Sequence, residues 1–119
     1  MSRSRITQVT LMDAVPISSE TKYSNPHSFR ICTGSAALIV ASTAGTLEIS
    51  QQCSPDKVSW YDPVDSANSP KGVVAIGQTV TTGIYIVFHP VLAEWIRFKI
   101  VESTAATVVT LKLLLREEA

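Results

Sequence analysis

The sequence has few of the residues that carry covalent and metal chemistry in enzymes. Its 119 residues include two cysteines and two histidines. Nucleophilic catalysis most often needs a histidine base beside the nucleophile, and zinc needs about four closely spaced ligands. No CxxC, HxxxH, G-x-S-x-G, G-x-G-x-x-G or P-loop pattern is present. We therefore expect a protein that is not an enzyme, with no catalytic residues, no metal site and no cofactor.

Charge and long apolar runs are also scarce. Ten Lys and Arg balance ten Asp and Glu, whereas nucleic-acid binding draws its affinity from an excess of cations on phosphates. No apolar run approaches the roughly 20 residues of a membrane span, and the N-terminal MSRSRITQVT has no hydrophobic signal-peptide core. We expect no nucleic-acid partner, no membrane partner and no signal peptide, and hence a cytoplasmic protein.

The sequence is instead rich in β-branched residues, since Val, Ile and Thr make up 35 of the 119. These side chains favour the pleated surface of a strand. Short alternating segments separated by turn residues indicate two packed sheets rather than alternating strands and helices. The sequence predicts one all-β domain over residues 1–119, an antiparallel, jelly-roll-like β-sandwich of about seven to nine short strands.

Two segments give the clearest alternation. In 95–101, Ile96, Phe98 and Ile100 share one face. In 107–115, one face carries Val109, Leu111, Leu113 and Leu115. The continuous apolar run AALIVAS (36–42) predicts a central strand. Further strands are expected at 9–12, 15–23, 28–33, 46–53, 73–76, 79–82 and 83–89.

Other segments are expected to lie outside regular strands. Pro90 suits a first helical position, so 90–94 is predicted to form at most one short helical turn. Residues 1–14 are expected to form an N-terminal arm or an edge strand. The longest loop runs from Ser54 to Lys71, and long loops in compact domains are often functional.

The side chains of this loop have competing interpretations. Asp56, Asp62 and Asp65 either hold its turns, as Asp does by bonding nearby backbone, or serve as acid–base groups or calcium ligands. Trp60 and Tyr61 are adjacent, so in an extended chain they point to opposite sides. One then packs on the sandwich, and the other is free to stack on a sugar or a protein partner. The two cysteines, Cys32 and Cys53, are expected to be free, partly buried thiols.

One longer pattern resembles known families. The strand GTLEISQQ (45–52) is followed by CSPDKVSWYDPV (53–64), then AEWIRFKIVES (93–103) and the closing strand TVVTLKLLLR (107–116). Over residues 34–116 this order resembles small β-sandwich domains of bacteriophage and prophage virion proteins. It is also similar to discoidin-type, galactose-binding-like modules.

The resemblance to virion proteins implies a structural or assembly protein of a phage-like particle, associated with its head, connector, tail or fibre. Such a protein would form homo-oligomers, dock onto other virion proteins, and pass from the cytoplasm into the virion during assembly. Strands near both chain ends are candidate edge strands for pairing between subunits. The residues expected on them are Val9, Leu11, Leu111, Leu113 and Leu115.

Two other functions remain open. The discoidin-type likeness implies a carbohydrate-binding module that contacts a glycan through loop and strand residues, namely Asp56, Trp60, Tyr61, Asp62 and Arg97. A small cupin-like enzyme would need a metal cluster, for which His89 and Glu94 are the available residues.

Overall fold

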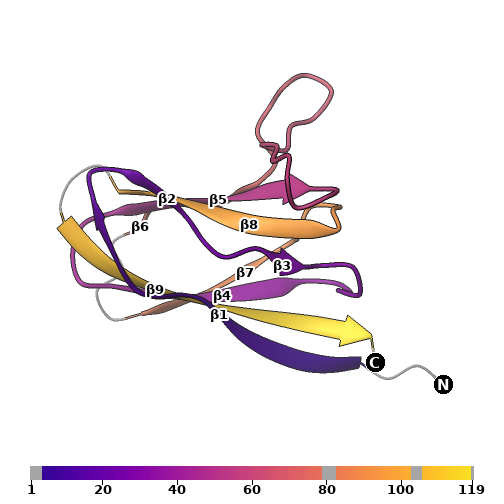
Figure 1. The fold of residues 1–119 in the computed structure, drawn as a ribbon, viewed down its shortest axis with the longest axis horizontal. Helices are drawn as coiled ribbons and strands as arrows, with labels where there is room; N and C mark the ends of the chain where they lie inside the picture. Colours follow the sequence, from indigo (N-terminus) through magenta and orange to yellow (C-terminus); the bar gives the residue numbers. More distant parts are fainter. Residues whose placement is uncertain (1–3, 79–82, 103–105, 119) are drawn as a thin grey trace.

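The computed structural model describes residues 4–78, 83–102 and 106–118, which form two antiparallel sheets packed face to face (Figure 1). This part of the chain contains strands and no helix, which confirms the predicted all-β sandwich. The strands are β1 (Ser4–Ser18), β2 (Thr21–Tyr23), β3 (His27–Ser28), β4 (Ala36–Ser42), β5 (Leu47–Ser54), β6 (Val73–Gln78), β7 (Ile84–Phe88), β8 (Trp95–Glu102) and β9 (Ala106–Glu118).

The strand order is that of a jelly roll. One sheet, called here the β1 sheet, has the order β1-β9-β4-β7, and the other, the β8 sheet, has the order β2-β8-β5-β6. β3 pairs with β8 beyond the end of β2, so β2 and β3 act as one interrupted edge strand. The chain crosses repeatedly between the sheets, and strands from its two ends pair with each other. With β2 and β3 counted as one strand, each sheet has four strands, and two four-stranded sheets connected in this way make the jelly-roll form of the sandwich.

The core lies between the sheets and is built from the predicted apolar faces. On β8, Ile96, Phe98 and Ile100 are fully buried, while the residues between them are partly exposed. On β9, Val109, Leu111, Leu113 and Leu115 are buried in the same way. Phe98 meets Phe88 of the opposite sheet edge to face, with 5.6 Å between ring centroids. These contacts confirm the predicted inward faces of both strands.

The two chain ends differ in their position within the β1 sheet. β1 lies at one edge of the sheet and pairs with β9. β9 lies inside the sheet, between β1 and β4. The expectation that Leu111, Leu113 and Leu115 belong to an edge strand is therefore wrong, because their strand has hydrogen-bonding partners on both sides.

One local prediction is also wrong. The predicted strand over 28–33 ends at Ser28, because the Cys32 N–H donates to the Phe29 carbonyl and turns the chain. Residues 90–94 form an irregular connection without a helical turn, which is within the predicted limit of at most one short turn. Their backbone bonds to other elements instead: the Val91 N–H donates to the Gln51 side chain, and the Glu94 carbonyl accepts from Phe29. The predicted strand at 79–82 lies outside the described residues.

Gly45 and Gly34 provide a matched test of crowding at turn glycines. Both have a positive φ, 78° and 71°, but a Cβ on Gly45 would overlap the buried Glu102 carboxylate, whereas one on Gly34 meets no atom within 4 Å. We expect Gly34→Ala to cost about 1 kcal/mol of unfolding free energy from backbone strain. Gly45→Ala should cost about 2–4 kcal/mol because overpacking adds to the strain. Urea denaturation measures both, and equal losses would show that Glu102 does not crowd Gly45.

Candidate functional site

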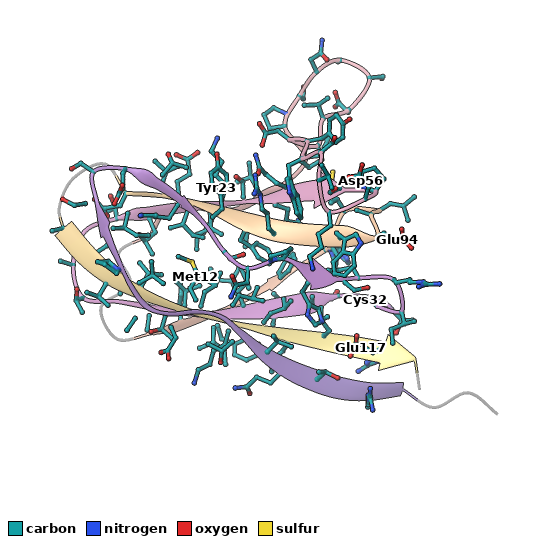
Figure 2. All side chains as sticks on the ribbon, in the orientation of Figure 1. Met12, Tyr23, Cys32, Asp56, Glu94 and Glu117 are labelled. Carbon is teal, nitrogen blue, oxygen red and sulfur yellow. The ribbon has the colours of Figure 1, made fainter. Side chains whose placement is uncertain are left out.

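The candidate site lies on the outer face of the β8 sheet, where the loop after β5 folds back. Figure 2 labels Tyr23 on this face and Asp56 near the base of the loop. Arg97 lies between the inward-facing Ile96 and Phe98 of β8, so its side chain points outward. Its position on a central strand lets it meet residues from both neighbouring strands and from the loop.

Arg97 is stacked between two aromatic rings. Its guanidinium carbon lies 4.2 Å from the ring centroid of Tyr23 on β2 and 4.4 Å from that of Trp60 in the loop. Its Nε donates to Gln52 Oε1 at 2.9 Å, and Gln52 Nε2 donates to Asp62 Oδ1 at 2.8 Å. Gln52 and Arg97 are directly opposite each other on β5 and β8. One continuous set of contacts therefore ties the loop to both strands.

The loop backbone is fixed to the end of β5 beside this stack. The N–H and carbonyl groups of Cys53 and Tyr61 bond to each other at 3.0 and 2.9 Å. The adjacent rings diverge as predicted: Trp60 packs on Arg97 and is half-buried, while Tyr61 is 58% exposed. Trp60 thus holds the loop on the sheet, and Tyr61 is the ring that it leaves accessible.

Asp56 forms the turn that opens the loop. Its Oδ1 accepts hydrogen bonds from the N–H groups of Val58 and Ser59, both at 2.9 Å, and from the Ser54 hydroxyl at 3.0 Å. Lys57 adopts φ 67°, a conformation that favours glycine, and its Nζ lies 4.7 Å from the centroid of the Trp95 ring. The hydrogen bonds of the Asp56 carboxylate are therefore made with residues close to it in the chain, and they stabilise the turn.

Asp65 closes the far end of the loop in a similar way. Its Oδ1 accepts from the N–H groups of Ala67 and Ser69, and its Oδ2 lies 3.4 Å from Lys71 Nζ. The backbone hydrogen bonds hold the pKa of this carboxyl below its ordinary value. In the part of the chain that the structure describes, no three His, Cys, Asp or Glu side chains are grouped to hold a metal. The turn-forming interpretation accounts for the backbone hydrogen bonds of Asp56 and Asp65, whereas Asp62 accepts from the Gln52 side chain.

Both cysteines are free, half-buried thiols. Cys53 lies at the end of β5 beside the Arg97 stack, and Cys32 lies elsewhere. The backbone of Cys32 forms an isolated antiparallel β-bridge with Glu117 of β9, and the two residues lie at the same end of the sandwich (Figure 2). Burial raises the pKa of both thiols, and the Glu117 carboxylate raises that of Cys32 further. A raised pKa lowers the thiolate fraction and so disfavours nucleophilic chemistry.

The sequence predicts five residues for glycan contact, and the structure brings three of them together: Trp60, Asp62 and Arg97. Asp56 instead forms a separate turn at the start of the loop. Sequence reasoning missed Tyr23 and Gln52. Gln52 shares the outward parity of Ser50 on β5, so alternation alone could have found it. Tyr23 comes from a distant part of the chain and becomes a neighbour of Arg97 only when β2 pairs with β8.

Comparison with solved structures finds the same architecture in the crystal structure of SPBc2 prophage-derived protein YomS. The two align with a TM-score of 0.63 over 97% of this chain and 96% of that one, at 12% sequence identity. At that identity the likeness shows a shared fold. It agrees at fold level with the expected resemblance to prophage proteins and gives no support to the discoidin-type likeness.

The chain matches no protein-family model. No curated protein matches it either. Among the described residues, the structure has no helix that is long and apolar enough to span a membrane.

Arg97 and Lys99 allow the stack to be tested on neighbouring outward positions of β8. We expect Arg97→Ala to lower the free energy of unfolding by about 1–3 kcal/mol, because it removes two ring contacts and a charge-assisted hydrogen bond. Lys99→Ala, the control, should change it by less than about 0.5 kcal/mol. Chemical denaturation gives both values, and Trp fluorescence reports release of Trp60. Similar small effects would show that the stack does not stabilise the fold.

The Asp56 turn predicts a pH response. Backbone N–H groups of Ser59 and Val58 stabilise the carboxylate and lower its pKa below the ordinary 3.8. Because the folded-state pKa is the lower one, the stability gained is complete above the unfolded-state pKa and is lost as pH falls through the folded-state pKa. An NMR titration should show the Val58 and Ser59 amides moving with a midpoint below 3.8.

The control for this titration is Asp56→Asn, which keeps the turn geometry but cannot ionise. In that variant the Val58 and Ser59 amides should no longer shift over the same pH range. A wild-type midpoint above the ordinary value would contradict the turn as described.

Proposed function

We propose that this protein is a non-enzymatic structural component of a phage-like particle, which acts by self-association and by docking to other particle proteins. The observation that carries the proposal is the end-to-end match to a prophage-derived protein, which covers 97% of this chain. Jelly rolls recur in viral capsids as building blocks. The acidic side chains of the loop also support it. Asp56, Asp62 and Asp65 each accept hydrogen bonds from groups of their own chain.

The outer face of the β1 sheet supports a docking role. Ile6 on β1 and Tyr85 and Val87 on β7 are 68%, 59% and 65% exposed. Together with Leu114 and Ala37 they border one shallow groove that crosses the sheet. Apolar side chains gathered on one exposed face are typical of protein–protein contact surfaces.

Carbohydrate binding is the second candidate, and the exposed ring of Tyr61 is the observation that favours it. Sugar recognition by stacking needs an accessible ring beside polar groups that fix the orientation. Trp60, the other ring of the predicted set, already has one face covered by Arg97. Tyr61 alone provides less stacking surface than a paired platform, so we rank this function below particle assembly.

The particle role is tested by mass spectrometry of phage-like particles purified from cells that carry the gene. We expect the chain to copurify in a fixed ratio to the major head or tail protein, and deletion of the gene to give incomplete particles that a plasmid copy restores. An abundant cytosolic host protein serves as the contamination control. Absence of the chain from intact particles would overturn the proposal, and specific binding on a glycan array that Tyr61→Ala abolishes would favour carbohydrate recognition.

A further inference from the structure

Among the strands that the structure describes, none pairs with the N-terminal half of β1 along the outer edge of its sheet. The Thr33 N–H, just before β4, donates to the Arg116 carbonyl at 2.8 Å, so the backbone groups of Arg116 point toward the β4 side of β9. Those of Leu114 point the same way, because alternate residues of an antiparallel strand share a direction. Ile6 and Gln8 lie opposite these two residues. Their own N–H and carbonyl groups therefore point away from β9, to the open edge.

The same alternation extends over the segment 4–10, where the register with β9 is unbroken. The residues whose backbone groups face the open edge are Ser4, Ile6, Gln8 and Thr10. Native proteins normally block such an edge with bulges, proline or charged side chains, because it can pair with another strand. Within this segment only Arg5 is charged.

The second half of β1 does carry this protection. The register shifts twice between Thr10 and Val15, Ala14 adopts φ 49°, and Pro16 follows. Bulges bend and twist an edge strand away from a partner, and proline removes a donor. One strand thus has a blocked half and an open half.

We propose that the open half of β1 pairs antiparallel with β1 of a second copy of this chain, about a two-fold axis at Thr7. In this register, every residue of segment 4–10 whose backbone groups face the open edge gains a partner. Ile6 lies opposite the partner's Gln8, and Arg5 lies opposite the partner's Val9. No like charges meet, and the two β1 sheets become one continuous sheet of eight strands. Strand addition at an open edge supplies affinity through main-chain hydrogen bonds.

The inference rests on the proposed self-association and names its contact. Pairing would cover Ile6, which is 68% exposed at the end of the apolar groove. Standard stable interfaces bury at least about 1,200 Å² of accessible surface, and one short strand pair buries less than that. The dimer should therefore form with increasing protein concentration rather than be obligate.

The test is solution mass by light scattering over a concentration series of the full chain. We expect wild type to rise from 12.9 kDa toward twice that mass. Gln8→Pro removes an N–H at the open edge that β9 does not use, and Ile6→Lys places a charge there, so both variants should stay monomeric. Circular dichroism and thermal unfolding should show that both keep the wild-type fold.

Val108→Lys is the matched control, because Val108 is a partly exposed apolar residue on β9, inside the same sheet. It should dimerise like wild type. If Gln8→Pro fails to fold, Ile6→Lys decides the result. A wild type that is monomeric at all concentrations would overturn the edge contact. An oligomer unchanged by Gln8→Pro and Ile6→Lys would also overturn it while leaving self-association intact, and the particle role is judged separately by copurification.

Discussion

The rest of the structure depends on the apolar core between the two sheets, to which β8 and β9 both contribute. β8 is a central strand of one sheet and β9 of the other, and each turns an unbroken row of buried aliphatic or aromatic side chains inward. Because side chains alternate along a strand, burying this row also fixes which side chains face outward. The position of Arg97 on the outer face, and of Leu114 on the opposite outer face, is a consequence of that single constraint. The two outer surfaces are therefore set by the core before any loop contact forms.

The strands that build this core were the part most open to prediction from sequence. Strict alternation in 95–101 and 107–115 predicts both the extended backbone and which side chains face the core. The apolar run at 36–42 indicates a strand with partners on both sides. Prediction failed where tertiary hydrogen bonds decide the backbone. Residues 29–33 alternate like a strand, but their backbone bonds to two separate parts of the fold. The Phe29 N–H donates to the Glu94 carbonyl, and the Thr33 N–H donates to the Arg116 carbonyl.

The candidate site shows the same division. Divergence of Trp60 and Tyr61 follows from two adjacent residues in an extended chain, so it could be predicted. The contacts of Arg97 could not, since Tyr23 and Trp60 reach it from separate strands and loops. No short sequence pattern indicates that Tyr23 or Trp60 lies beside Arg97. Tyr23 reaches Arg97 because β2 pairs with β8, and Trp60 reaches it because the Cys53–Tyr61 β-bridge folds the loop back. Which strand becomes an edge is similarly a property of the sheet order.

The outer face of the β8 sheet and the edge of the β1 sheet have opposite characters. On the β8 sheet, the loop uses its aromatic, cationic and acidic side chains to bind itself down, through the Arg97 stack, the Asp56 turn and the pair of Lys57 with Trp95. The β1 edge is left open over residues 4–10 but blocked by two register shifts and Pro16 beyond them. A strand that only had to avoid pairing would be protected along its whole length. Protection of one half alone is better explained by a partner strand that ends where the bulges begin.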